Sequence, residues 1–403
     1  MSNSPMVGTG YGVQTAEVVP RLAKAGHDVA IANNFGHHGP TIEWDGIPIY
    51  SASKDQALND VIRAHAQTWR ADWVVTLYDT WTMRRNMWPD RVASWVPIDH
   101  QPAPPEVSEW CRQVTPIAMS RFGQRMLRDQ GIDSSYVPHS INTAVFKPTP
   151  VAPNGHKARE IIGIPEDAFV VMIAAANQGI SPPRKAWGEM FDALGYFMRE
   201  HPDVWLYVHS DSNQKPPHGA DLLNLRDMCG IPADRVKWAD AYAYASHQIS
   251  QADLAILYSM SDVLLASSMG EGFGIPVIEA QACGLPVIVS DFTAQPELCA
   301  SGWLVKGQPW RDTLQHAAAF FTPYISSIVA RLREAREAKG NQGLRERAVK
   351  FAADYESDAV FERYWLPVLA ELEASLDSPA PVEVTGLSRA ERRAAERAAR
   401  KRK

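Results

Sequence analysis

Apolar runs of four or five residues alternate with helix-periodic segments along the first half of the chain. Runs of this length are typical of strands buried in a parallel sheet, and the segments between them suit crossover helices. One helix is expected over residues 15–25, ending at Gly26, and another over residues 121–131. The strands expected in this part are Val29–Ala32, Trp73–Leu77, Trp95–Ile98 and Ile117–Ser120.

The same alternation resumes after residues 149–160, which are rich in proline, glycine and charge and which we interpret as a linker. Residues 1–148 are therefore expected to form one α/β domain, and residues 161–350 a second. The strands expected in the second domain are Phe169–Ala175, Val204–Val208, Val236–Trp238, Asp262–Ala266 and Val287–Val289.

The composition is that of an ordinary globular chain, with 45% hydrophobic and 21% charged residues among 403. No run approaches the roughly 20 apolar residues of a membrane helix, and the first residues lack the pattern of a signal peptide. The four cysteines are far apart and form no C-x-x-C pair, which argues against a disulfide framework or a zinc site. We therefore expect a cytoplasmic protein.

The net charge of −6 hides a basic end on an acidic body. Residues 388–403 carry eight Lys or Arg against two Glu, so the tail at residues 379–403 is strongly basic. Ser388 and Glu391 form a capping box, which predicts a helix without an apolar stripe. This helix is expected either to be solvated or to contact an anionic membrane or a nucleic acid, and membrane contact would make the protein peripheral to the membrane.

A glycine-rich turn at residues 270–276 places two carboxylates at the start of an expected helix. Glu271 lies in the turn, and Glu279 follows eight residues later, a little over two helical turns along. Pro276 suits a first helical position because its missing N–H costs nothing there. The free N–H groups and the positive dipole of such a helix start can hold a phosphate, while the carboxylates can accept hydrogen bonds from sugar hydroxyls. The pattern therefore suits a nucleoside diphosphate sugar.

The segment Leu257–Lys306 resembles the Glu-x7-Glu signature of the retaining glycosyltransferases of family 4, also called glycosyltransferase group 1. The resemblance implies the GT-B fold: two Rossmann-like domains facing a cleft, with a C-terminal helix, here residues 351–378, crossing back to the first domain. It also implies transfer of a sugar from a UDP- or GDP-sugar to an acceptor hydroxyl with retention of configuration, and neither a metal nor a cofactor. The sequence contains no Asp-x-Asp motif and no cluster with metal-ligand spacing.

The resemblance assigns roles to the residues of the turn. Glu279 would bind the ribose hydroxyls, and Glu271 would act in catalysis by binding sugar hydroxyls near the reacting carbon. Backbone groups of the four residues after Glu271 would surround the donor; these are Gly272, Phe273, Gly274 and Ile275. Gly10 and Gly12 match a turn of the family's first domain, where the backbone approaches the diphosphate or the acceptor.

The family's pair of cations is altered in this chain. Asn177 stands where the family commonly has an Arg, and an apparent insertion displaces the Lys that follows. Lys185 best matches the family lysine, and Arg184 would supply the missing guanidinium, so both are expected to stabilise charge on the leaving diphosphate. Asn177 is still expected to lie against the donor.

Two further residues follow strand ends in the first domain. His100 would face the donor sugar across the cleft, where a neutral imidazole can hydrogen-bond a hydroxyl or a phosphate. Asp99 is the neighbouring carboxylate, and Asp79 is a further candidate at another strand end.

Members of the family open with a buried strand, but only residues 1–7 precede the glycine turn here, and they contain no apolar run. We therefore expect the sheet of the first domain to lack its first, central strand, which would leave backbone groups unpaired on two neighbouring strands.

Two alternatives to a transferase remain open. One is a non-catalytic relative that binds sugar nucleotides or glycans, which the Asn177 substitution and the missing first strand leave open; the other is a sugar-nucleotide epimerase. The sequence does not name the base or the sugar of the donor. The acceptor could be a lipid, a glycan, a protein, a small molecule or a nucleic acid.

Overall fold

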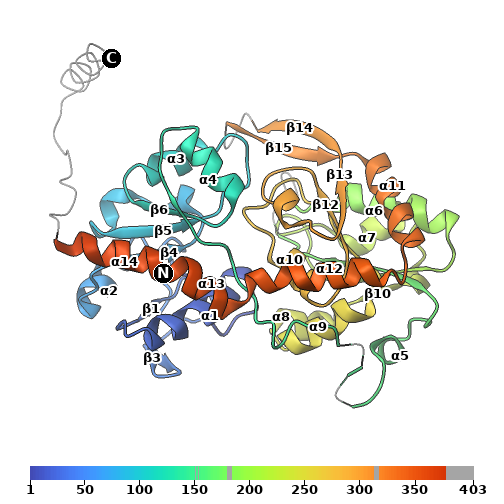
Figure 1. Cartoon of the computed structure of the whole chain (residues 1–403), viewed down its shortest axis with the longest axis horizontal. Coiled ribbons are helices and arrows are strands. Elements are labelled where there is room, and N and C mark those ends of the chain that lie inside the picture. The colour runs from blue at the N-terminus through green and yellow to red at the C-terminus, as the bar shows by residue number, and fades with distance from the viewer. Residues whose placement is uncertain (150, 153, 179–183, 313–316, 378–403) are drawn as a thin grey trace, which may run out of the picture.

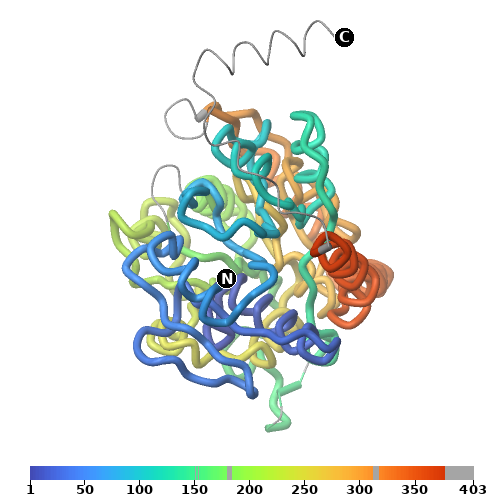
Figure 2. The backbone as a smooth tube through the Cα atoms, turned by 90° about the vertical axis from the view of Figure 1, so that its left-hand side faces the viewer, coloured from blue at the N-terminus to red at the C-terminus, as the bar shows by residue number. Residues whose placement is uncertain are grey.

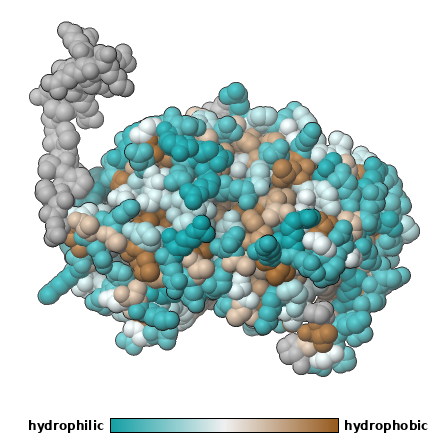
Figure 3. Space-filling model, in the orientation of Figure 1, coloured by the Kyte–Doolittle hydropathy of each residue, from teal (hydrophilic) through white to brown (hydrophobic). Residues whose placement is uncertain are grey.

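The computed structural model describes residues 1–149, 151–152, 154–178, 184–312 and 317–377. Two α/β domains lie side by side, the first at the left and the second at the right of Figure 1. Hydrophilic side chains cover much of the face seen in Figure 3. No helix within the described ranges combines the length and the apolar character needed to cross a membrane. The basic tail, with the helix predicted at Ser388, lies outside the described residues.

The strands of the first domain form two separate sheets, with the orders β1-β3-β2 and β4-β5-β6-β7. The start of the chain lies between them: Ser2 N donates to Ala32 O at 3.2 Å, and Leu77 N donates to Met1 O at 2.9 Å. Figure 2 shows this start in the middle of the domain. The strands are β1 Ile31–Ala32, β2 Ile42–Trp44, β3 Ile47–Tyr50, β4 Val74–Leu77, β5 Val92–Val96, β6 Thr115–Ala118 and β7 Ser135–Tyr136.

Strand β1 is shorter than the run Val29–Ala32 that predicted it. Val29 and Ala30 border a cavity between the two sheets, so no strand accompanies them on that side. The first helix, α1 (Gly10–Lys24), begins earlier than predicted because Thr9 caps it: the Thr9 hydroxyl accepts a hydrogen bond from Gly12 N at 3.1 Å. The other helices of this domain are α2 Ile62–Trp69, α3 Pro105–Cys111 and α4 Arg121–Arg128.

Six parallel strands form the sheet of the second domain, in the order β10-β9-β8-β11-β12-β13. Its strand β8 is buried at every position because packed side chains cover both faces: Phe169, Val171 and Ile173 join one hydrophobic cluster, while Val170 and Met172 join another. The strands are β8 Phe169–Ala174, β9 Val204–His209, β10 Val236–Trp238, β11 Val263–Ala266, β12 Val287–Ser290 and β13 Gly302–Val305. The prediction of two Rossmann-like α/β domains is confirmed.

Helices surround this sheet, and α11 packs beside α6 on the face of the Phe169 cluster. A two-stranded hairpin, β14 (Gly307–Asp312) with β15 (Ala318–Pro323), extends from the sheet toward the first domain. The helices are α5 Ala158–Ile162, α6 Trp187–Glu200, α7 Leu222–Met228, α8 Ala241–Ala245, α9 Gln251–Met260, α10 Ile275–Ala282, α11 Ile325–Glu337 and α12 Gln342–Ala352.

Backbone contacts join the domains near this hairpin. Gln101 of the first domain pairs with Ala319 of β15 through two hydrogen bonds, of 3.2 and 2.9 Å. The carboxylate of Glu297, in the second domain, accepts hydrogen bonds from the N–H groups of Arg121 and Phe122 at the start of α4. Each contact holds a loop of one domain against an element of the other.

The end of the described chain returns to the first domain (Figure 1, red). After α12, the chain forms α13 (Ser357–Val360), a π-helical turn and α14 (Leu366–Ala374). Trp73 donates its indole N–H to Leu372 O at 3.1 Å, and the rings of Trp95 and Trp365 meet edge to face with centroids 5.0 Å apart. These aromatic contacts anchor the returning helix.

We predict that Trp365→Ala destabilises the protein by roughly 3–5 kcal/mol, because Trp365 is 2% exposed and its loss leaves a cavity at the anchor. Leu366→Ala, at the adjacent and 41% exposed first position of α14, is the matched control and should change stability by less than about 1 kcal/mol. Urea unfolding of both variants checks this. Equal midpoints for the two variants would show that Trp365 does not anchor the helix.

Candidate active site

The turn between β11 and α10 brings the predicted carboxylates to the boundary between the domains. Gly274 has a φ of +115°, which glycine tolerates, and α10 starts at the next residue with Pro276 in its first turn. A Cβ added at Gly272 would lie 2.7 Å from Cβ of Pro97, and one added at Gly270 would collide with the carbonyl of Asp99. These glycines therefore let a loop of the first domain rest directly on the turn.

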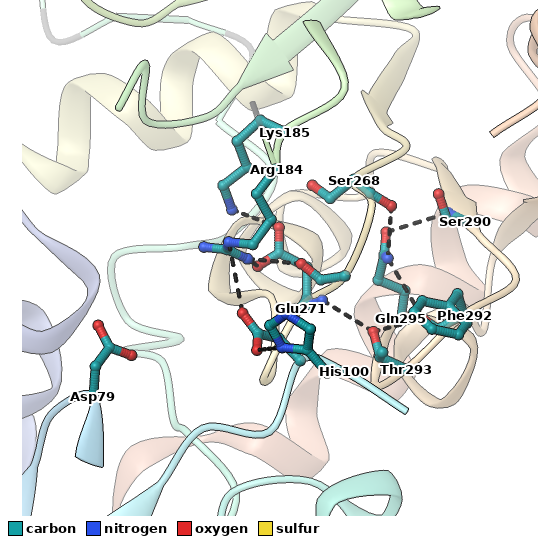
Figure 4. Close-up of polar contacts among 12 residues, drawn as sticks. Asp79, His100, Arg184, Lys185, Ser268, Glu271, Ser290, Phe292, Thr293 and Gln295 are labelled. Carbon is teal, nitrogen blue, oxygen red and sulfur yellow. Dashed lines mark hydrogen bonds and ion pairs between the residues drawn. The ribbon is translucent and has the colours of Figure 1, made fainter. Parts of the chain in front are cut away.

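Glu271 is held between two cations (Figure 4). Its Oε2 lies 2.8 Å from Nη1 of Arg184, and its Oε1 accepts a hydrogen bond from Nζ of Lys185. Burial alone would raise the pKa of Glu271, but Lys185 and Arg184 lower it to about 2. Burial and the neighbouring Arg184 lower the pKa of Lys185. The site therefore brings an ionised carboxylate into contact with two basic side chains.

Contacts with Asp99 and His100 extend this group of polar side chains into the first domain. Arg184 Nε lies 3.6 Å from Asp99 Oδ2, and Asp99 Oδ1 lies 2.6 Å from Nδ1 of His100. Although burial acts to raise it, the pKa of Asp99 lies well below its usual range because of His100 and Arg184. The His100 ring packs against Phe320 of β15, with centroids 3.9 Å apart. Glu271, Arg184, Asp99 and His100 thus form one connected network across the domain boundary.

The second predicted carboxylate has a different environment. Glu279 lies on α10, is 5% exposed, and accepts a hydrogen bond from the hydroxyl of Tyr258 at 3.0 Å. Burial raises the pKa of Glu279 to about 7, and the Tyr258 hydrogen bond opposes this only in part. The two carboxylates of the motif therefore differ: Glu271 is ionised, and Glu279 titrates near neutrality.

The glycine turn of the first domain faces the start of α10. A Cβ at Gly10 would lie 3.4 Å from Cδ1 of Ile275, and Gly8 N donates to Nδ1 of His247 at 3.4 Å. At Gly12 a Cβ would collide with the carbonyl of Val7, so glycine is required there. Two helix starts, those of α1 and α10, are thereby brought together, and both present backbone N–H groups and positive dipole ends.

Asp79 lies near this network without a direct bond to Arg184 (Figure 4). Its Oδ1 accepts a hydrogen bond from the hydroxyl of Tyr11 at 3.3 Å. Burial and the charge of Asp99 raise the pKa of Asp79, while Arg184 lowers it. Tyr11 was not among the residues proposed from the sequence, although its place between Gly10 and Gly12 could have drawn attention to it.

Asn177 has a different set of partners from the cations. Its amide nitrogen donates to the carbonyls of Asp211 and Ala220, and its amide oxygen accepts from Ala220 N at 2.9 Å. These bonds hold the loop after β8 against the loop after β9. Contact between Asn177 and a donor stays a prediction.

Sequence reasoning also missed the residues that brace the turn. Thr293 Oγ1 accepts a hydrogen bond from Glu271 N at 2.9 Å. Gln295 bonds Ser268 O through its amide nitrogen and Ser290 N through its amide oxygen, both at 3.2 Å. These bracing residues lie just before the glycine turn, or at the end of β12 and in the segment that follows it. Polar residues in such loops carry no specific sequence signal.

The pKa of Glu279 makes stability pH-dependent in a direction that can be tested. The folded protein holds this proton up to about pH 7, whereas the ordinary pKa is 4.5, so the stabilisation by the proton is lost as pH rises between these values. Relative to wild type, Glu279→Gln should gain about 3 kcal/mol in free energy of unfolding over that interval. Denaturant titrations at several pH values check this, with Glu337→Gln on an exposed position of α11 as control. A pH-independent difference would contradict the raised pKa.

Comparison with known proteins bears on the motif and the fold. Residues 244–319 match the family model described as glycosyl transferases group 1. Over 218 residues the chain is 28% identical to a D-inositol 3-phosphate glycosyltransferase of Saccharomonospora viridis, covering 51% of this chain and 45% of that protein. A protein of the same name from Mycobacterium tuberculosis is 29% identical over 185 residues, 44% of this chain and 34% of that one. The chain thus matches less than half the length of these relatives.

Solved structures resemble the whole chain at low identity. Sucrose-phosphate synthase from Thermosynechococcus elongatus covers 91% of this chain, with 94% of its own length matched, at a TM-score of 0.68 and 17% identity. The Anabaena protein HepE, solved with UDP and glucose, matches 92% of this chain and 98% of its own, at a TM-score of 0.60 and 15% identity. The chain has the GT-B fold, and its residues 244–319 carry the signature of glycosyl transferases group 1.

Proposed function

We propose that this protein is a retaining glycosyltransferase of family 4, which moves a sugar from a UDP- or GDP-sugar to an acceptor hydroxyl. The observation that carries the proposal is the position of Glu271, whose side chain is 13% exposed, between Arg184 and Lys185 in the turn that starts α10 and opposite the start of α1. Anions are favoured at such helix starts, and paired cations add charge-assisted contacts to phosphate oxygens.

The diphosphate would occupy the space served by these groups. Its negative charges would share Arg184 and Lys185 with Glu271, and its oxygens would accept hydrogen bonds from the backbone of Phe273, Gly274 and Ile275. Glu271, ionised because its pKa is about 2, would accept hydrogen bonds from the sugar. Glu279 would bind the ribose hydroxyls.

The reaction we propose is a same-face substitution. The bond from the anomeric carbon to the phosphate oxygen breaks, the acceptor oxygen bonds to the same face of that carbon, and the acceptor proton passes to the departing phosphate oxygen. Arg184 and Lys185 stabilise the charge that develops on the diphosphate, the kind of preorganised electrostatic effect that dominates many enzymatic barriers. No side chain has to form a covalent intermediate, and no metal ion is required.

His100 would help to orient the sugar from the first domain. Asp99 Oδ1 accepts a hydrogen bond from Nδ1 of His100, and this bond fixes the orientation of the imidazole ring. Tyr11 and Asp79, on the same side, would receive the acceptor hydroxyl. Gly10, Gly12, Gly272 and Asn177 would complete the donor surface with their backbone groups.

A uridine donor is supported by solved structures of GT-B neighbours, which contain UDP and glucose in one case and UDP and GlcNAc in another. The acceptor could be a lipid, a glycan, a protein or a small molecule, and the proposed location is cytoplasmic. Contact of the basic tail with an anionic membrane would place the protein at the membrane periphery, and contact of the tail with a nucleic acid is the alternative.

Donor binding is tested by thermal shift and calorimetry with UDP, GDP, ADP and their common sugars. A nucleotide at a hundredfold excess over its Kd should stabilise the wild type by about 2.7 kcal/mol. Glu279→Ala should weaken the binding of that nucleotide, whereas Glu337→Ala on the surface of α11 should leave its affinity unchanged. If no nucleotide binds the wild type, the proposal of a donor site is wrong.

Catalysis is tested with Arg184→Ala and Arg184→Lys in a transfer assay against a panel of acceptors. Arg184→Ala should lower kcat by roughly a hundredfold or more, because one preorganised cation is removed from the leaving group. Lysine keeps the charge but cannot reach Gly270 O, Glu271 and Asp99 together. The kcat of Arg184→Lys should therefore lie between those of the wild type and Arg184→Ala. The products decide between the functions: a new glycoside with retained configuration supports transfer, an altered donor sugar indicates an epimerase, and binding without turnover indicates a non-catalytic relative.

A further inference from the structure

The hairpin of β14 and β15 contacts both domains through one edge of β15 (Figure 1). Ala319 N donates to Gln101 O at 2.9 Å, and Gln101 N donates to Ala319 O at 3.2 Å. Two residues further along the same edge, Phe321 N donates to Met269 O at 2.8 Å. Gln101 directly follows His100, and Met269 directly precedes the glycine turn. One strand thus pairs with the loop of the first domain that carries His100 and with the segment that leads into the turn.

The register of this pairing places His100 opposite Phe320. Gln101 and Ala319 exchange both backbone hydrogen bonds, so they form a hydrogen-bonded pair in the antiparallel sense. The next pair along is therefore His100 with Phe320, and side chains approach most closely at such a non-hydrogen-bonded pair. The two ring centroids lie 3.9 Å apart, with an angle of 46° between the ring planes. The contact between the imidazole and Phe320 thus follows from the backbone pairing between the domains.

A third ring continues this row on the hairpin. Trp310 of β14 is the partner of Phe320 in the register of the hairpin, and their rings stack with centroids 6.1 Å apart and an angle of 22° between the planes. Trp310 is 42% exposed, whereas Phe320 is 6% exposed and His100 is 5% exposed. The row of three rings therefore runs from the surface of the hairpin to the buried imidazole.

Phe320 also packs beside the segments that carry the charged residues of the site. It belongs to a small buried cluster with Met269 and with Ala186, which directly follows the two basic residues. A Cβ added at Gly270 would lie 3.4 Å from Cδ1 of Phe320, so this ring lies against the glycine turn as well. The second domain therefore holds Phe320 in one place, and the ring of His100 rests against it.

Two contacts of different kinds restrain the imidazole of His100. Asp99 Oδ1 lies 2.6 Å from Nδ1 and holds one edge of the ring, while Phe320 packs against the ring itself. The χ2 torsion of a histidine is broad, so a single hydrogen bond leaves the ring free to tilt, and packing removes this freedom. A group that acts on a substrate has to be held to within about 0.5 Å of its productive position.

We propose that Phe320 is a positioning residue for sugar transfer: carried on β15 of the second domain, it fixes the ring of His100, in the first domain, in the orientation that meets the donor sugar. This inference rests on the proposed function, in which His100 orients the sugar. Phe320 itself touches no substrate and acts through His100. The hairpin thereby links the pairing of the two domains to the geometry at the reacting sugar.

The test is a double-mutant cycle of Phe320→Leu and His100→Ala in the transfer assay. Leucine keeps an apolar side chain but removes the flat ring, so Phe320→Leu should lower kcat about tenfold and change the KM of the donor less than about twofold. In the His100→Ala protein no imidazole is left to position. Adding Phe320→Leu there should change kcat by less than about twofold.

Phe321→Leu is the matched control, because Phe321 is also 6% exposed but its ring stacks on Phe292, on the other face of β15. Its effect on kcat should be the same in the wild type and in His100→Ala. If Phe320→Leu does not fold, Trp310→Ala at the exposed end of the row takes its place in the cycle. Its loss of kcat should be smaller and should also disappear without His100.

Equal losses of kcat from Phe320→Leu with and without His100 would overturn this proposal and leave the proposed function intact. So would a normal kcat for His100→Ala, since Phe320 would then have nothing to act through. A raised KM with an unchanged kcat in Phe320→Leu would likewise contradict it. If the wild type transfers no sugar to any acceptor of the panel, the proposed function is wrong, and this proposal is wrong with it.

Discussion

The contact of one carboxylate, that of Glu271, with two cations is the interaction on which the architecture of the site depends. Glu271 could not remain ionised inside the protein without Arg184 and Lys185, because burial penalises its charge. Arg184 in turn contacts Asp99, so the charge requirement of one turn in the second domain reaches a loop of the first. The same loop rests on Gly270 and Gly272, where any side chain would collide with it. Electrostatics and close packing therefore fix the two domains against each other at one place.

The two carboxylates of the motif have different pKa values because their surroundings differ. They are eight residues apart and chemically identical, yet the pKa of Glu271 is about 2 and that of Glu279 about 7. The difference comes from their neighbours: two cations for Glu271, and one neutral tyrosine hydroxyl for Glu279. A carboxylate ionised at all physiological pH values suits contact with a charged centre, and one poised near neutrality suits hydrogen bonding to hydroxyls.

Segments outside its two sheets make contacts that hold the first domain in place. Backbone hydrogen bonds of Met1 and Ser2 bridge its two sheets, and Trp365 and Leu369 near the end of the described chain pack into the adjoining hydrophobic cluster. Gln101 and the start of α4 are tied to the second domain by Ala319 and Glu297. Contacts between segments remote in sequence thus help to hold the first domain in place.

The sequence by itself determined the two α/β domains and the placement of the turn, because buried parallel strands and glycine- or proline-marked helix starts depend on local pattern. It also singled out Glu271, Arg184, Lys185 and His100, which the structure joins in one network. Tertiary structure alone decided that Asn177 braces two loops, that Tyr11 reaches Asp79, and that Thr293 and Gln295 hold the turn. The physical reason is that a polar side chain in a loop acquires its partner only when distant segments meet, and such long-range contacts leave no periodic trace along the chain.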